Sequence, residues 1–305
     1  MSIEVESLTK VYGSQKAIDG LTFNVQKGDI LGFLGPNGAG KTTTMKILTC
    51  FMPQSTGSAK ICGIDTREDS LAVRKRIGYL PESNPLYKEM YIKEYLSYIA
   101  RIYGLKNIKN RVAEMIDITG LGREQNKKIS EISKGYKQRV GLAQAMIHDP
   151  DVLIMDEPTS GLDPNQLVEI RQVIRDIGKD KAVILSSHIM QEVEALCNRV
   201  IIINQGKKII DDKINALANV LRGEQIISIE FVNAPTDIDK VFGSNNSIIR
   251  IEKTGKNTVD IYADKKSDIR EQIFDTAVRN NLKIIGMSQN QASVEEVFHQ
   301  LTIAN

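Results

Sequence analysis

The sequence predicts an α/β fold with a parallel core sheet, an N-terminal antiparallel β subdomain, a helical insert and a small C-terminal α+β domain. Two continuous apolar runs, "DVLIMDE" and "KAVILSSH", are typical of strands buried on both faces. The segment between them, "NQLVEIRQVIRDIGKD", has helical periodicity. Because buried strands that alternate with helices pair in parallel, these observations indicate an α/β core.

The chain before these runs divides into a β-rich part and a helical part. Residues 1–62 alternate short β-patterned runs, such as "IEVESLTKVYG", with turn signals such as "KGD". Residues 84–150 are helical in pattern, since Ile92, Leu96 and Ile99 follow one another at spacings of four and three. We therefore expect an antiparallel β subdomain first and a helical insert at about 84–150.

The chain after these runs changes character at about residue 215. The strand pattern "RVIIINQGKKII" at 199–210 ends the first part. Strand-like segments follow at 226–232, 247–253, 258–263 and 283–289, with helix-like segments at 267–279 and 293–302. We expect one domain over 1–215 and a separate small α+β domain over 216–305.

Bulk composition restricts the classes of function. The 305 residues include 40 basic and 38 acidic side chains, and a net charge of +2 provides no general attraction for nucleic acid or anionic lipid. Cys50, Cys62 and Cys197 are far apart in sequence and fit free thiols in a reducing cytosol. No apolar run approaches the ~18 residues that span a bilayer, and the first residues lack a signal-peptide pattern. We expect a soluble cytosolic protein, so any membrane role requires another polypeptide.

The segment "ILGFLGPNGAGKTTTMKIL" combines an apolar strand, a glycine-rich loop and a helix. Its pattern, Gly-x-x-x-x-Gly-Lys-Thr, points backbone N–H groups at phosphate oxygens, supplies a lysine for the terminal phosphates and offers a hydroxyl to Mg²⁺. The bare pattern occurs by chance in roughly one in a hundred sequences of this length. The sequence therefore predicts nucleoside triphosphate binding by Gly35, Pro36, Asn37, Gly38, Ala39, Gly40, Lys41, Thr42 and Thr43.

Two acidic residues follow the next buried strand, in "DVLIMDEPTSGLD". Asp156 lies at the C-terminal end of that strand, where open parallel sheets bind ligands, and is suited to hold a metal through water. Glu157, the next residue, is suited to polarise water in line with the γ-phosphate. For this element alone the alternative is a strand end capped by solvated acids.

Three further residues are candidates for the same site. His188 follows the strand "AVILSS", and although a lone histidine is more often structural, three strands that end in phosphate-relevant groups favour contact with the γ-phosphate. Glu82, at the end of "IGYLPE", would approach the metal or lie in solvent. Tyr12, in "KVYG", would stack on a purine or pack in the small sheet.

A second phosphate-friendly segment, "ISKGYKQR", lies at 132–139. Ser133 is suited to cap a helix, Gly135 permits close approach, and the helix dipole favours an anion. In isolation the pattern favours the simpler interpretation, a helix cap with a solvated basic face. One chain with a complete phosphate loop has no evident need of this segment.

Taken together, "GPNGAGKTT", "ISKGYKQR", "VLIMDE", "SGLD" and "SSH", in this order, resemble the ATP-binding subunits of ABC transporters over residues 1 to about 215. The resemblance implies a P-loop NTPase fold, ATP and Mg²⁺ as ligands, and ATP hydrolysis. It also implies roles for single residues: Thr42, Asp156 and Glu82 at the metal, Glu157 as base, His188 as switch, Tyr12 as adenine platform and Ser160–Asp163 as the D-loop.

The same resemblance implies two protein partners. In this family Ser133 and Gly135 would contact the γ-phosphate of ATP held by a second ATPase subunit, identical or related. A separate integral membrane permease would dock at the helical insert and after Glu82, placing the chain at the inner face of the cell membrane. The chain departs from the usual family pattern at Lys134, Tyr136 and Glu82.

Narrower features resemble the ABC-2 exporter branch, namely "YLPE", "SKGYKQR" and the C-terminal "SVEEVFHQLT". The segments "HIMQEVEALCNRVIIINQGK" and "GLDPNQLVEIR" resemble the gliding-motility ABC transporters of Bacteroidetes. Two alternatives stand against transport. A soluble ABC ATPase acting on ribosomes or DNA usually has two fused cassettes or a long coiled coil, neither evident here, and a GTPase-like switch would need an Asn-Lys-x-Asp sequence, which is absent.

Overall fold

A computed structural model describes residues 1–214, 224–235, 237–243, 247–264 and 268–291. The chain divides into two compact units, Met1–Ile214 and Asn215–Asn305. In the described part of the chain, no helix has both the length and the apolar character that a bilayer crossing requires.

The first unit begins with an antiparallel sheet of order β2-β1-β4-β5. Its strands are β1 (Ile3–Tyr12), β2 (Gln15–Val25), β4 (Thr56–Ile61) and β5 (Ile64–Asp65). The predicted antiparallel subdomain is therefore confirmed.

A second sheet of six strands forms the centre of the unit, in the order β10-β9-β3-β8-β7-β6. Its strands are β3 (Ile30–Leu34), β6 (Ile77–Leu80), β7 (Val152–Asp156), β8 (Ala182–Ser187), β9 (Arg199–Asn204) and β10 (Lys207–Lys213). Five of these strands, in the spatial order β6-β7-β8-β3-β9, pair in parallel with their neighbours, which confirms the predicted core sheet.

The segment 199–210, expected as one strand, is instead an antiparallel hairpin of β9 and β10. Its turn lies at Gln205 and Gly206, which both have positive φ, 47° and 79°. Such φ values fit a tight hairpin turn, and a glycine adopts them at little cost.

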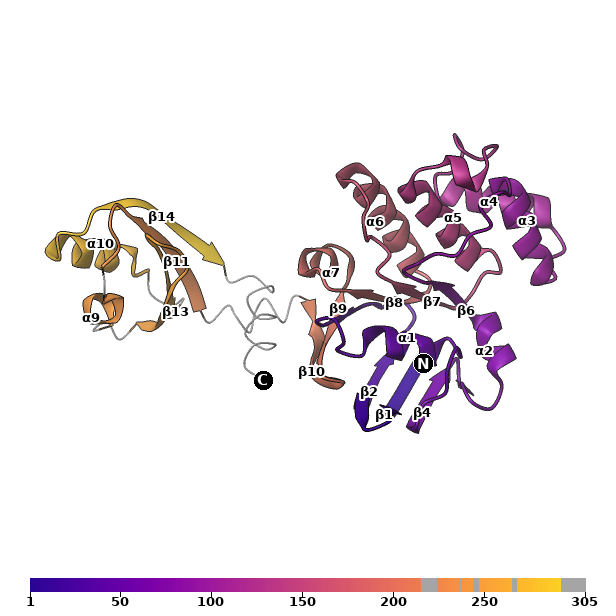
Figure 1. Ribbon diagram of the computed structural model, residues 1–305, viewed down its shortest axis with the longest axis horizontal. Coiled ribbons are helices and arrows are strands. Elements are labelled where there is room, and N and C mark those ends of the chain that lie inside the picture. The colour runs from indigo at the N-terminus through magenta and orange to yellow at the C-terminus, as the bar shows by residue number, and fades with distance from the viewer. Residues whose placement is uncertain (215–223, 236, 244–246, 265–267, 292–305) are drawn as a thin grey trace. The chain divides into compact units, whose positions relative to one another are not determined.

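Helices cover both faces of the central sheet (Figure 1). Helix α1 (Lys41–Leu48) lies between the two sheets and packs its apolar side chains into their shared core, where Phe23 and Phe33 also meet at 5.6 Å. Helices α5 (Lys134–Met146) and α6 (Pro164–Gly178) lie on the opposite face. Two shorter helices, α2 (Ser70–Arg76) and α7 (Met190–Leu196), complete this layer arrangement.

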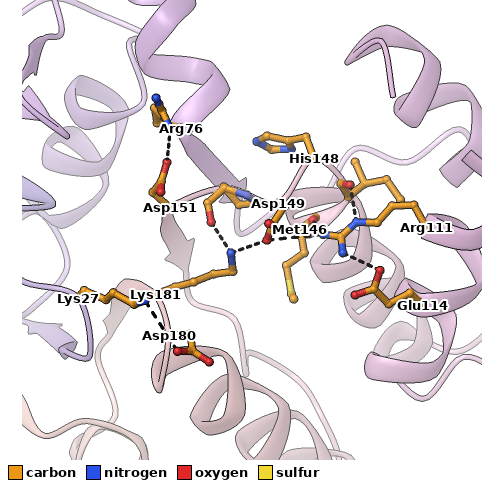
Figure 2. Close-up of polar contacts among 12 residues, drawn as sticks. Lys27, Arg76, Arg111, Glu114, Met146, His148, Asp149, Asp151, Asp180 and Lys181 are labelled. Atoms are coloured by element: carbon orange, nitrogen blue, oxygen red, sulfur yellow. Dashed lines mark hydrogen bonds and ion pairs between the residues drawn. The ribbon is translucent and has the colours of Figure 1, made fainter. Parts of the chain in front are cut away.

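The predicted helical insert contains α3 (Ile92–Ile102), α4 (Ile108–Ile118), a 3₁₀ turn (Ile129–Glu131) and α5. Figure 2 shows how its far end is anchored. Arg111 of α4 donates to the carbonyls of Met146 at 2.7 Å and Ile147 at 2.8 Å, at the C-terminal end of α5. Lys181, just before β8, pairs with Asp149 at 2.7 Å. These contacts join the insert to the N-terminal edge of the core strands.

The second unit has the element order β11 (Glu224–Phe231), α9 (Ile238–Phe242), β12 (Ile248–Lys253), β13 (Thr258–Asp264), α10 (Arg270–Arg279) and β14 (Ile284–Gln291). Its sheet is antiparallel in the order β12-β13-β11-β14, which is the split βαβ arrangement. Both helices pack on alternate residues of the strands to form one core. This core includes Ile227 of β11, Ile261 of β13 and Ile273 of α10. The helix expected at 293–302 lies outside the described residues.

Candidate functional site

The phosphate loop connects β3 to α1 and encloses its own lysine. Gly40, at the N-cap of α1, has φ 107°, and a Cβ there would clash with the carbonyl of Ala17. The Lys41 ammonium donates to the carbonyls of Gly35 at 2.6 Å and Pro36 at 3.2 Å. Burial lowers the pKa of Lys41, while the nearby carboxylates of Glu157 and Asp156 oppose that shift. The loop thus holds a cation that can exchange carbonyl partners for phosphate oxygens.

Asp156 is the last residue of β7 and is held by two hydroxyl groups. Its Oδ1 accepts from Ser186 Oγ at 2.5 Å and from Thr42 Oγ1 at 3.4 Å. The same Ser186 Oγ accepts from the backbone N–H of Glu157 at 3.1 Å. Ser186, at the neighbouring position on β8, therefore aligns both acidic residues, a role that sequence reasoning missed although "SSH" contains it.

Glu157 and His188 form a direct pair. The distance from Glu157 Oε1 to His188 Nδ1 is 2.9 Å, with the glutamate side chain 10% exposed and the histidine side chain 51% exposed. Burial raises the pKa of the Glu157 carboxyl, although the hydrogen bond and charge of His188 act against that rise. The backbone of Glu157 has φ 50°, a strained region for a glutamate. Such outliers persist where the surrounding structure fixes a side chain in place.

These groups meet at a cavity of about 240 Å³. Its lining brings together the phosphate loop, the end of the β6 segment and the ends of β7 and β8, through Asn37, Gly38, Gly40, Lys41, Thr42, Thr43, Glu82, Glu157 and His188. Asp156 is buried next to it through its contact with Thr42. Glu82 is in this lining and is also exposed to solvent, so both interpretations of it stay open.

Tyr12, at the end of β1, is outside this lining. The residue is 48% exposed, which leaves open both interpretations, stacking on a purine and packing in the small sheet. The Lys10 ammonium lies 5.3 Å from the ring centroid, and the Tyr12 hydroxyl donates to the Met52 sulfur at 2.9 Å.

The segment 132–139 is also outside the lining of this cavity. Ser133 is the N-cap of α5, and its Oγ accepts from the N–H of Tyr136 at 3.4 Å. Asp163 is the N-cap of α6 and accepts from the N–H of Gln166 at 2.9 Å. Gly135 is buried against the side chain of Gln166, a neighbour that no sequence motif indicated. The chain therefore does not bring Ser133, Gly135 or Asp163 to its own phosphate loop.

A separate apolar groove of about 770 Å³ lies between the core and the helical insert. Phe51 and Ile102 in its lining are 74% and 63% exposed, and Tyr103 stacks on His148 with ring centroids 3.9 Å apart. The residues after Glu82, including Pro85, line the same groove.

Comparisons with known proteins identify relatives of this arrangement. The profile of the ABC transporter family matches residues 18–160. The chain is 42% identical over 207 residues to the bacitracin transport ATP-binding protein BcrA of Bacillus licheniformis, covering 67% of each chain. It is 32% identical over 305 residues to the Nod factor export ATP-binding protein I of Rhizobium meliloti, covering 99% of this chain and 88% of that protein. A solved ATP-binding subunit of an ABC transporter is similar with a TM-score of 0.66 at 28% identity, covering 72% of this chain and 93% of that chain.

Proposed function

Because the chain belongs to the ATP-binding subunits of ABC transporters, a family of ATPases, we propose that it binds and hydrolyses ATP between two subunits and so drives a separate membrane permease. The observation that carries this proposal is the convergence of Lys41, Thr42, Glu157 and His188 on one cavity. In the proposed organisation residues 1–215 form the ATP-binding cassette and residues 216–305 an accessory domain.

The phosphate loop, Gly35 to Thr43, binds the phosphates of ATP through its backbone N–H groups and the N-terminus of α1. Lys41 leaves the carbonyls of Gly35 and Pro36 and pairs with the terminal phosphates. Tyr12 stacks on adenine, for which its exposed ring is suited. These roles extend the family relationship to the individual residues of this chain.

Mg²⁺ is the metal that suits this site. Mg²⁺ in proteins is held by one or two carboxylates, a hydroxyl, waters and substrate phosphates. Thr42 and Asp156, whose oxygens lie 3.4 Å apart, together with Glu82 at the cavity, offer this donor set. The ion would neutralise charge on the β- and γ-phosphates.

Glu157 acts as the general base in this mechanism. Its carboxylate takes a proton from a water molecule as the water oxygen bonds to the γ-phosphorus and the bond to the ADP oxygen breaks. His188, held to Glu157 at 2.9 Å, donates to the γ-phosphate and fixes the orientation of the base. ADP, inorganic phosphate and the proton leave.

One chain cannot complete this site. Ser133, Gly135 and Asp163 are outside the cavity of their own chain, yet Ser133 and Gly135 present a helix N-terminus suited to an anion. We propose that they contact ATP bound to the second subunit, so that closure of the dimer follows from ATP binding.

Glu157→Gln tests the assignment of the base. The variant should bind ATP normally and form a stable ATP-bound dimer, while kcat falls on the order of 10²–10⁴-fold because the proton acceptor is lost. Nucleotide binding, size-exclusion chromatography and phosphate release measure the three properties. Hydrolysis at the parental rate would show that another group is the base.

The permease is the proposed membrane partner. The groove that contains Phe51 and Ile102 offers an exposed apolar surface at the helical insert, where a permease would dock and hold the chain at the inner face of the membrane. We further propose that the transporter is an exporter, because the chain is similar to the bacitracin and Nod factor relatives. We also propose a role in gliding motility, because the segments that begin at Gly161 and His188 resemble the gliding-motility transporters.

Crosslinking in cells followed by identification of the recovered partner tests this proposal. Recovery of a polytopic membrane protein supports transport. Loss of surface spreading by cells in which the gene for that membrane protein is deleted supports gliding motility. Recovery with RNA or DNA instead would favour a soluble ATPase.

A further inference from the structure

The N-termini of α5 and α6 meet at one side chain. Ser133 caps α5 and Asp163 caps α6, and the N–H that Asp163 accepts at 2.9 Å belongs to Gln166. The side chain of Gln166 extends to the other cap, where its Nε2 donates to Ser133 Oγ at 3.5 Å. Gln166, which follows the D-loop, therefore contacts the segment 132–139, and the side chain of Lys134 in that segment lies beside Gly161 of the D-loop.

Packing places Gln166 here independently of that hydrogen bond. Its carboxamide occupies the space beside Gly135, where an added Cβ would overlap all three polar-end atoms of the side chain. Gly135 is buried and Gln166 is partly buried. Gly135, which has no side chain, thus leaves the space that the carboxamide of Gln166 fills.

The hydrogen bonds of Ser133 use its oxygen as an acceptor and leave its proton to donate. A serine hydroxyl has two acceptor positions and one proton to donate. The N–H of Tyr136 at 3.4 Å and the Nε2–H of Gln166 at 3.5 Å occupy the acceptor positions. With both acceptor positions used, the O–H remains to donate to a further acceptor such as a phosphate oxygen.

We propose that Gln166 is a positioning residue that orients Ser133 to donate to ATP on the second subunit. The inference rests on the proposed function, since that function supplies the phosphate. It adds a residue of α6, directly after the D-loop, that acts through Ser133 on the ATP bound to the partner.

A second contact keeps the two helices together without Gln166. The buried Arg139 of α5 pairs with Glu169 of α6 and also donates to the carbonyl of Thr119 at 3.2 Å. Replacing Gln166 should therefore disturb Ser133 rather than separate α5 from α6.

The test uses Gln166→Met, which keeps the length of the side chain and removes its donor, in the full chain carrying Glu157→Gln. The ATP concentration at the midpoint of dimer formation should rise about fivefold, the equivalent of one ordinary hydrogen bond. Nucleotide binding to the monomer should not change, because Gln166 is outside the lining of its own cavity. Gln166→Glu, which places a negative charge near the phosphate, should raise the midpoint further.

Gln172→Met is the matched control, because Gln172 is an exposed glutamine of the same helix that bonds only Asp176 among the contacts described. It should leave the midpoint unchanged. An unchanged midpoint in Gln166→Met would overturn the proposal, and so would an equal loss of nucleotide binding by the monomer. If the parent Glu157→Gln chain does not dimerise with ATP at all, the two-chain site itself fails, a result seen before Gln166 is changed.

Discussion

In the proposed mechanism, the paired side chains of Glu157 and His188 carry most of the chemistry. Burial makes the carboxylate costly to ionise, and the adjacent imidazole reduces that cost. A base with a raised pKa holds a proton more readily at the moment of water attack, while it must still be ionised at working pH. The geometry therefore predicts a pH dependence that His188 controls.

Replacing His188 with alanine should shift the acidic limb of the kcat profile to higher pH. The imidazole lowers the pKa of Glu157, so its removal lets burial raise that pKa further. The base works only when deprotonated, and the rate therefore falls as pH drops through this pKa. A pH profile of residual hydrolysis measures the shift. His148→Phe, which keeps the stacking on Tyr103 outside the cavity, is the control and should leave the limb in place.

At this scale the sequence predicted the residues that carry charge and missed those that orient them. Lys41 was predicted from the glycine-rich loop pattern, and Glu157 and His188 because the ends of parallel strands meet at one edge. Ser186 and Gln166 escaped because serine and glutamine are common and their roles depend on which neighbour each contacts. Such contacts follow from the packing of β7 on β8 and of α5 on α6.

Among elements, α5 connects two functions. Its N-terminus is proposed to bind the ATP of the partner. Its C-terminal end is held by hydrogen bonds from Arg111 of α4 (Figure 2). The helical insert was predicted from its periodicity, but this anchor was not, because Arg111 is one of many surface-type cations in the sequence. The hairpin of β9 and β10 was likewise missed, since a continuous β pattern does not reveal a turn at Gln205.

Arg111→Met should destabilise the first unit by about 1–3 kcal/mol, because it leaves two carbonyls at the end of α5 without their charged donor. Urea denaturation followed by circular dichroism measures the loss. Arg101→Met, at an exposed position on the neighbouring helix α3, is the matched control and should change stability by no more than about 0.5 kcal/mol. Equal effects of the two substitutions would contradict the anchoring role.

For the whole molecule, the decisive feature of the proposal is that the ATP site is divided between two chains. Each chain has a cavity lined by residues of the glycine-rich loop and by Glu157, and the N-terminus of α5, at Ser133, lies outside the lining of that cavity. Sequence alone left "ISKGYKQR" with two interpretations, and the resemblance to a family supplied the second subunit. The separation seen in the fold supports the same reading, since Ser133 is absent from the lining of its own cavity.

Mixing two inactive variants tests this central claim most directly. Ser133→Arg should block the contribution to the partner, and Lys41→Ala should block the chain's own cavity, so each homodimer is inactive. Random mixing makes about half of the dimers mixed, each with one intact composite site, and should restore about a quarter of the wild-type ATPase rate. Lack of any recovery, with both variants folded and mixed dimers formed, would contradict an ATP site shared between two chains.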